Sequence, residues 1–322
     1  MLTDGMGQAA MEDYRGRTVC PADFDEFWDL TLTESRAQDG AAVTRRPAPT
    51  ALRAIECHDL TFPGFAGEPV KAWLRLPAGL TGPAPAVVQF QGYGGGRAHP
   101  LENLPWAAAG YVHLVMDTRG QGSSWSAGST PDPHGAGPQA PGVMTKGIES
   151  PETYYYRRLM TDAVRAVEAV SRLDEVDAAR VAVVGASQGG ALALAAAALA
   201  PEVAAAAIRV PFLCDYRRAV EATDVNPFAE LTRYLAVHRA SADRVFAVLS
   251  YFDAVNFARR AAAPSHWTVA LMDAVVPPST VYAAYNNYTG PKAITVWPFN
   301  GHESGGPLDD ALALDFFAQA LA

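Results

Sequence analysis

The segment 181–200 constrains the fold more than any other, because strand, turn and helix patterns follow one another in it without a break. Residues 181–184 are apolar and mostly β-branched, and the turn Gly185-Ala186-Ser187-Gln188-Gly189-Gly190 comes directly after them. Residues 191–200 contain only alanine and leucine, and this run is too short to span a membrane. A buried strand that passes through a glycine-rich turn into a buried helix predicts a sheet covered by helices.

Other short apolar runs lie on both sides of this segment and alternate with helical patterns. Mostly continuous apolar runs of this length are typical of parallel strands that are covered on both faces. The chain is therefore predicted to be an α/β protein with a mostly parallel central sheet and helices on both faces. The further strands are expected at 86–90, 112–116, 205–210, 268–271 and 294–297.

The ends of the chain show different patterns. Residues 52–55 and 70–76 alternate apolar and polar side chains, which predicts an opening hairpin. Apolar residues at helical spacing predict an N-terminal helical extension after Pro21 and a closing helix from about Pro307. Residues 1–20 are expected to be disordered.

Two long segments interrupt the alternation of strands and helices. Residues 122–147 are rich in glycine, proline and serine and predict a long surface loop. Residues 212–263 have mostly helical patterns and predict a helical insertion before the strand at 268–271. A third helix is expected from about Tyr154 to before Asp174, with one face on the sheet. Loops and insertions at the ends of strands usually shape substrate pockets.

Ser187 is the candidate nucleophile. In a nucleophile elbow the serine lies in a strained strand-to-helix turn, so the residues two positions before and after it must be small. Gly185 and Gly189 meet this demand. The alternative is an ordinary glycine-rich turn, but the predicted strand before Ser187 and helix after it favour the elbow. The start of that helix also provides backbone N–H groups for a developing oxyanion.

A serine nucleophile needs a base within hydrogen-bond reach and a carboxylate that orients the base. In α/β-hydrolases they follow in the chain order serine, acid, histidine, each after a strand. Asp273 follows the strand at 268–271, and His302 follows the strand at 294–297. The site would then use loops from most of the chain, so residues 1–322 are expected to form one domain.

Other residues compete for the roles of acid and base. Asp309 and Asp310 lie near His302 in sequence, but they are typical of the first turn of a helix. His238 and His266 precede any position that the chain order allows for the base.

The loop after the strand at 86–90 is the candidate second half of an oxyanion hole. It contains Tyr93 in the run Gln91-Gly92-Tyr93-Gly94-Gly95-Gly96, where glycines allow the backbone to approach a substrate closely. We expect the N–H groups of Tyr93 and Gln188 to bind the oxyanion; an unremarkable glycine turn is the alternative.

The loop after the strand at 112–116 contains Arg119, Gly120 and Gln121. Arg119 has two possible uses: it contacts a substrate, or its buried guanidinium braces loops. The second use is the commoner one for an arginine in such a position.

Composition excludes several classes of protein. The chain has 25 lysines and arginines against 34 aspartates and glutamates, a net charge of −9, which argues against a nucleic-acid partner. The start of the sequence has no pattern of a secretory signal, and no apolar run is long enough for a membrane span. Three separated cysteines predict no disulfide framework, so a cytoplasmic location is expected.

No cofactor or metal is expected either. A zinc motif that begins at His302-Glu303 would need a second histidine at position 306, which is glycine. No loop has the spacing that cradles a dinucleotide or nucleotide phosphate.

These motifs together resemble the acetyl xylan esterase and cephalosporin-C deacetylase family, carbohydrate esterase family seven. Arg119-Gly120-Gln121, the elbow around Ser187 and His302-Glu303 have the family's pattern, and the similarity extends from about Pro21 to the C-terminus. Further similar segments are Met144-Thr145-Lys146-Gly147-Ile148, Thr153-Tyr154-Tyr155-Tyr156-Arg157, Asp162-Ala163-Val164-Arg165-Ala166, Leu249-Ser250-Tyr251-Phe252-Asp253 and Pro277-Pro278-Ser279-Thr280-Val281.

The resemblance implies an α/β-hydrolase that removes acetyl groups from small acetylated sugars, such as xylo-oligosaccharides, and from cephalosporin C. It maps a catalytic triad onto Ser187, Asp273 and His302 and an oxyanion hole onto Tyr93 and Gln188. It also implies a cytosolic homohexamer. One departure is that Gln91 stands where family members often have histidine, which affects how the oxyanion loop is held.

Three other functions are compatible with the same residues. A serine peptidase of this fold uses the same triad, although such enzymes usually carry an additional propeller or cap domain. A non-catalytic binding protein and a carrier that sequesters cephalosporins are the other two. The intact set of Ser187, Asp273 and His302 argues against the non-catalytic binding protein, and a carrier would bind cephalosporins without turnover.

Overall fold

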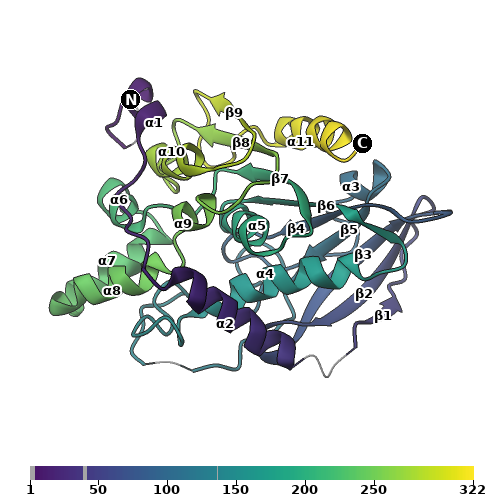
Figure 1. Ribbon diagram of the computed structural model, residues 1–322, viewed down its shortest axis with the longest axis horizontal. Helices are drawn as coiled ribbons and strands as arrows, with labels where there is room; N and C mark the ends of the chain where they lie inside the picture. Colours follow the sequence, from purple (N-terminus) through teal and green to yellow (C-terminus); the bar gives the residue numbers. More distant parts are fainter. Residues whose placement is uncertain (1–3, 39–41, 136) are drawn as a thin grey trace.

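A twisted sheet runs through the centre of the molecule (Figure 1). The computed structural model describes residues 4–38, 42–135 and 137–322. The strands of this sheet in the described residues are β1 (Thr44–Pro47), β2 (Ile55–Pro63), β3 (Pro69–Pro77), β4 (Ala84–Phe90), β5 (Val112–Met116), β6 (Val176–Ala186), β7 (Val203–Arg209), β8 (Ser265–Ala270) and β9 (Lys292–Trp297).

The order of the strands is β1-β2-β3-β5-β4-β6-β7-β8-β9. Strands β4 to β9 are parallel to their neighbours, whereas β1, β2 and β3 pair antiparallel and β3 meets β5 antiparallel. The predicted α/β architecture with a mostly parallel sheet is confirmed. Because parallel strands end at the same edge, the loops after β4, β6, β8 and β9 come together there.

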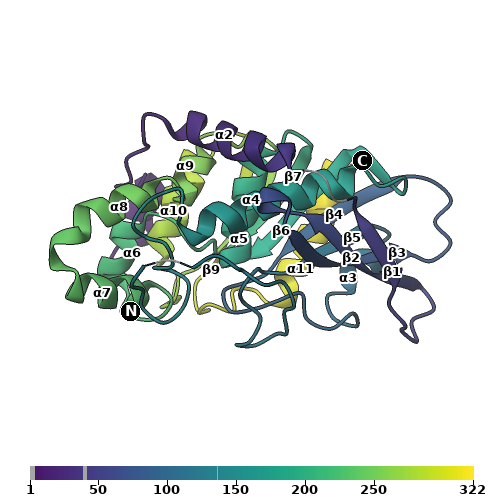
Figure 2. The same ribbon diagram turned by 90° about the horizontal axis from the view of Figure 1, so that it is seen from below.

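Helices cover both faces of the sheet (Figures 1 and 2). Helices α2, α4, α5 and α9 lie on one face, and α3 and α11 lie on the other. The bounds are α1 (Gln8–Asp13), α2 (Phe24–Ala37), α3 (Pro105–Ala108), α4 (Tyr155–Ser171), α5 (Gln188–Leu199), α6 (Tyr216–Ala222), α7 (Phe228–Val237), α8 (Ala242–Ser250), α9 (Ala254–Ala258), α10 (Pro278–Asn287) and α11 (Pro307–Ala320). Within the described residues, no helix combines the length and apolar character that a membrane crossing requires.

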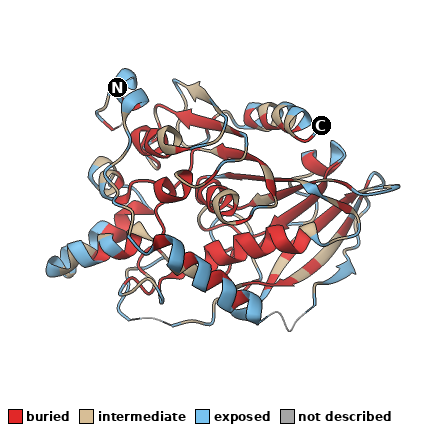
Figure 3. Cartoon of the chain, in the orientation of Figure 1, coloured by how far each residue is buried: buried red, intermediate tan, exposed pale blue. Residues whose placement is uncertain are grey.

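Helix α5 lies on the same face of the sheet as α2, α4 and α9, and Figure 3 shows it buried together with α4. It contains only alanine and leucine after its first three residues. A helix that is apolar all round is stable only when it is buried all round. The short alanine side chains let α5 approach β6 and β7 closely. Residues 188–196 of α5 are all buried, so the predicted buried helix is confirmed.

The hairpin before the parallel strands differs from the sequence prediction. The first strand of the predicted pair, at 52–55, begins instead at Ile55 and extends to Pro63, where it pairs with Pro69. The missed strand, β1, is exposed at all of its four residues. A period-two pattern marks only strands with one buried face, so an exposed edge strand leaves no such signal.

The N-terminal segment is ordered in the described residues, which corrects the expected disorder of residues 1–20. Met11 in α1 is fully buried, and Tyr14 donates a hydrogen bond to Asp215 at 2.7 Å. The Asn286 side chain binds the backbone carbonyls of Met11 and Tyr14. Positions 1–3 of that prediction lie outside the described residues. These contacts come from residues far away in sequence, so local patterns do not predict them.

The structure confirms, in the described residues, the predicted long loop at 122–147 and the predicted helical insertion at 212–263. Residues 117–135 and 137–154 contain no helix or strand, while the insertion at 212–263 contains α6, α7, α8 and α9. The proposal that all 322 residues form one domain stays a prediction.

Candidate active site

Ser187 lies in the sharp turn between β6 and α5. Its backbone has φ 57° and ψ −122°, a strained conformation for a residue with a side chain. The Ser187 N–H donates a hydrogen bond to Arg209 O at 3.0 Å, and Ser187 O accepts from the Phe212 N–H at 2.9 Å and from the Ala191 N–H of α5 at 3.1 Å. The turn is therefore fixed to the neighbouring strand β7 and the loop after it.

The two glycines of the motif are required by space. A Cβ atom on Gly185 would lie 2.1 Å from the carbonyl oxygen of Gly189, and a Cβ on Gly189 would lie 2.3 Å from the carbonyl oxygen of Phe90. Both distances are far below van der Waals contact, and backbone atoms cannot move aside cheaply. The spacing of the elbow motif therefore has a direct steric cause.

Ser187, His302 and Asp273 form a continuous chain of hydrogen bonds. His302 Nε2 lies 3.0 Å from Ser187 Oγ, and His302 Nδ1 lies 2.8 Å from Asp273 Oδ2. The N–H groups of Val275 and Val276 donate to the other carboxylate oxygen of Asp273, which is almost completely buried. The carboxylate is thus held in one orientation, with one oxygen directed at the histidine.

The competing residues lie elsewhere. Asp309 accepts hydrogen bonds from Trp297 Nε1 and the Gly305 N–H, and Asp310 pairs with Arg209. His238 stacks on Tyr234, and His266 contacts Thr295. Among the candidate pairs of acid and base, Asp273 and His302 are the residues that the structure brings to Ser187.

A cavity of about 680 Å³ opens in front of Ser187. This volume is in the range of small-molecule sites. Ser187, His302 and Tyr93 all line it, together with residues of the insertion and of the loop after β5. Its lining also includes Gln91, Gly92, Trp125, Asn226, Pro227, Glu230 and Val275.

Tyr93 is held by a glutamate that the sequence patterns did not indicate. The phenol of Tyr93 donates to Glu230 Oε1 at 2.7 Å and accepts from the Val143 N–H at 2.8 Å. Glu230, in α7 of the insertion, also accepts from the Met144 N–H. Burial raises the pKa of Glu230, an effect that the hydrogen bond from Tyr93 opposes. The one local hint was an acidic residue within the apolar run 228–231.

Gln188 is the first residue of α5, and its side chain is tied to the predicted loops. Its Oε1 accepts hydrogen bonds from Gln121 Nε2 at 2.9 Å and from the Tyr156 hydroxyl at 3.0 Å. Gln121 Oε1 in turn accepts from the N–H of Gly94 at 2.6 Å. Gln121 therefore connects the residue after Ser187 with the residue after Tyr93.

Gln91 is buried at the start of the loop that contains Tyr93. Its carbonyl accepts a hydrogen bond from Gln188 Nε2 at 3.3 Å. Its own Nε2 is buried with no hydrogen-bond partner in the described part of the chain. The backbone of Gln91, rather than its side chain amide, makes the contact with Gln188.

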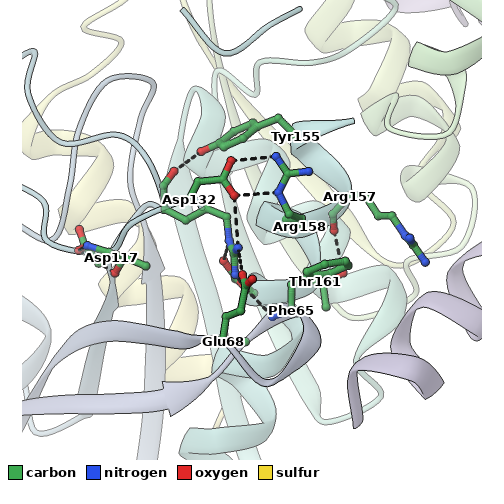
Figure 4. Close-up of polar contacts among 12 residues, drawn as sticks. Phe65, Glu68, Asp117, Asp132, Tyr155, Arg157, Arg158 and Thr161 are labelled. Atoms are coloured by element: carbon green, nitrogen blue, oxygen red, sulfur yellow. Dashed lines mark hydrogen bonds and ion pairs between the residues drawn. The ribbon is translucent and has the colours of Figure 1, made fainter. Parts of the chain in front are cut away.

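Arg119 and Gly120 lie in the loop after β5. Arg119 is fully buried, donates to both carboxylate oxygens of Asp162 and contacts Glu68. Its partner Asp132 also binds Arg158, as Figure 4 shows beside Glu68 and Tyr155. Arg119 is not among the residues that line the cavity. These contacts are those of a residue that braces loops, not of one that touches a substrate.

Asp132 is expected to make the free energy of unfolding depend on pH in the acidic range. Burial raises its pKa, but the hydrogen bonds from Arg158 and Lys146 outweigh burial and lower the pKa from 3.8 to about 2. A lowered pKa in the folded state means that the stabilisation is present above the unfolded pKa and is lost as pH falls toward the folded one. The expected loss is about 2 kcal/mol between about pH 4 and pH 2.

Urea unfolding of the wild type and Asp132→Asn at about pH 5 and pH 3 tests this expectation. The difference in the free energy of unfolding should shrink at the lower pH. The exposed Asp315→Asn in α11 is the matched control, with a difference that does not change. A pH-independent difference for Asp132→Asn would contradict the assignment.

The described residues contain no group of three or more His, Cys, Asp and Glu side chains that is arranged to hold a metal ion.

A mostly parallel sheet, a strained serine between strand and helix, and a histidine and an aspartate after later strands define an α/β-hydrolase. Within this class, the chain belongs to the acetyl xylan esterase family, whose model matches residues 1–320. The resemblance seen in the sequence motifs is confirmed.

Solved structures and a characterised relative agree with this membership. The acetyl xylan esterase from Paenibacillus sp. R4 is 36% identical with a TM-score of 0.93, covering 98% of this chain and 100% of that one. For acetyl xylan esterase 1 from Thermoanaerobacterium sp. JW/SL YS485 the identity is 35%, the TM-score 0.91 and the coverage 98% and 99%. Acetyl esterase Axe7A of Xylanibacter ruminicola is 28% identical over 295 residues, 88% of this chain. The match spans 64% of the length of that relative. Family and neighbours support a carboxylic ester hydrolase.

Proposed function

We propose that the protein is a serine esterase that removes acetyl groups from small O-acetylated carbohydrates, with xylo-oligosaccharides as the substrate class. One observation supports this most strongly: Ser187, His302 and Asp273 form an unbroken hydrogen-bonded chain at the mouth of a cavity. Membership in the acetyl xylan esterase family supports the acetyl group and the carbohydrate.

The proposed reaction has two acyl-transfer steps. His302 Nε2 takes the proton of Ser187 as Oγ attacks the acetyl carbonyl, and Asp273 stabilises the imidazolium that forms. The N–H groups of Tyr93 and Gln188 stabilise the oxyanion. His302 then protonates the sugar oxygen as its bond to the acetyl carbon breaks, which releases the sugar alcohol and leaves the acetyl group on Ser187. Water, activated by the same histidine, releases acetate.

Cephalosporin C is a second proposed substrate, on the basis of the family resemblance alone. A cytoplasmic location and a homohexamer are proposed on the same basis. A panel of acetylated xylo-oligosaccharides, glucose pentaacetate and cephalosporin C would rank these substrates. Absence of turnover of every acetylated carbohydrate would contradict the proposed substrate class.

The acyl chain is expected to be short. We expect kcat/KM for p-nitrophenyl acetate to exceed that for p-nitrophenyl octanoate by at least about tenfold, because an acyl pocket that fits an acetyl group would exclude the longer chain. Efficient cleavage of the octanoyl ester would indicate a general carboxylesterase instead.

Two further measurements separate the proposed function from its alternatives. A serine peptidase would cleave an aminoacyl p-nitroanilide, and we expect no such cleavage by this protein. A non-catalytic binding protein would not react with a fluorophosphonate probe, whereas an activated Ser187 is expected to be labelled.

A further inference from the structure

The cavity extends from Ser187 along the face of the sheet that α3 and α11 cover. Gln89 in β4 and Arg209 in β7 stand on this face near the carboxyl ends of their strands, two residues after Val87 and Ala207. Trp106 of α3 and Asp310 of α11 face the same cavity from the helices. This part of the cavity lies beside the elbow, because Arg209 O accepts the hydrogen bond from the N–H of Ser187.

Arg209 is the arginine that lines this part of the cavity. Its Nη1 pairs with Asp310 Oδ1 at 2.6 Å, and its guanidinium carbon lies 6.0 Å from the centre of the Trp106 ring. The other two nitrogens, Nε and Nη2, are buried without a hydrogen-bond partner among the described residues. Unpaired buried donors are costly, and a structural arginine normally uses them, as Arg119 does with Asp162.

We propose that Arg209, Asp310 and Trp106 form a subsite for the neutral, hydroxyl-rich sugar ring that bears the acetyl group. This inference rests on the proposed esterase function and assigns the alcohol side of the ester to this end of the cavity. A guanidinium donates to hydroxyl oxygens, a carboxylate accepts from hydroxyl hydrogens, and an aromatic ring packs against the apolar face of a sugar.

The charges of the cavity favour a neutral alcohol over an anionic one. Glu102, Glu230 and Asp310 line the cavity, against one arginine, Arg209. The guanidinium is already neutralised by Asp310, whose side chain is 42% exposed. A carboxylate next to the ester, such as that of cephalosporin C, would meet net negative charge in this cavity.

The test compares acetylated xylobiose with p-nitrophenyl acetate, which has no sugar ring. For Asp310→Asn and Arg209→Met, the ratio of kcat/KM for the sugar ester to kcat/KM for p-nitrophenyl acetate should fall about tenfold or more relative to the wild type, mainly through KM. Asp310→Asn keeps the shape of a half-exposed side chain, so it remains informative if Arg209→Met folds poorly. The same Asp310→Asn variant should gain kcat/KM for cephalosporin C relative to acetylated xylobiose.

Asp177→Asn is the matched control, because Asp177 forms an ion pair with Arg180 at 2.7 Å at the opposite end of β6. Its ratio should equal that of the wild type. An equal ratio in Asp310→Asn and Arg209→Met would overturn the subsite while leaving the esterase function intact. A wild-type protein that cleaves p-nitrophenyl acetate but no acetylated sugar would overturn both.

Discussion

Replacing Ser187 by alanine is expected to lower kcat for p-nitrophenyl acetate by about 10⁵-fold or more, which corresponds to about 7 kcal/mol of barrier. The substitution removes the Oγ atom of Ser187, which forms the hydrogen bond with His302 Nε2 and is the proposed attacking atom. Without it no acyl-enzyme forms. Steady-state assays and mass spectrometry after fluorophosphonate treatment measure the loss of turnover and of labelling together.

The control for this variant is Ser171→Ala, which removes a hydroxyl at the end of α4 that donates to the backbone carbonyl of Val167 in the same helix. Its activity should equal that of the wild type. Retained turnover in Ser187→Ala, at any rate near that of the wild type, would rule out the proposed nucleophile.

The second large effect is expected for Asp273→Asn, with kcat reduced by about 10⁴-fold. An asparagine amide can donate to His302 Nδ1, and this selects the tautomer in which Nε2 carries the proton. Such an imidazole cannot accept the proton of Ser187. The residue's contacts with Val275 and Val276 use an oxygen that asparagine retains, so the melting temperature should change little.

Kinetics and thermal melts of this variant, measured beside the exposed Asp315→Asn, separate the loss of orientation from the loss of a charge. A rate close to the wild type in Asp273→Asn would transfer the role of the acid to another carboxylate.

The parallel part of the fold follows from local signals. Strands β4 to β8 contain buried apolar runs, and β9, the partly exposed strand at the sheet edge, contains a β-branched one. Such runs have few alternatives once helical patterns separate them. The positions of Ser187, Asp273 and His302 follow from one rule of topology, since each lies after a strand that ends at the same edge. The order of the residues along the chain and their places after strands were enough to select them, whereas the hydrogen-bond distances come from the structure.

The remaining features depend on contacts between distant segments. The strand β1 is exposed, so burial leaves no pattern in its sequence. The order of the N-terminal segment comes from Asp215 and Asn286, more than 200 residues away along the chain. Glu230 was missed for the same reason, because its partner Tyr93 is separated from it by 137 positions. Pairing at such separations is decided by the tertiary fold.

The hydrogen bond between Glu230 and Tyr93 restricts which helical insertions this fold can accept. The insertion at 212–263 is a stretch of helices between two core strands, which suggests a part that can be exchanged for that of another hydrolase. Yet Glu230 in this insertion accepts a hydrogen bond from the phenol of Tyr93, in the loop after β4, and another from a backbone N–H of the long loop after β5. A chimaera with an insertion from another hydrolase therefore needs a matching hydrogen-bond acceptor at this position. Without one, the Tyr93 loop beside the site would lose a contact that holds it.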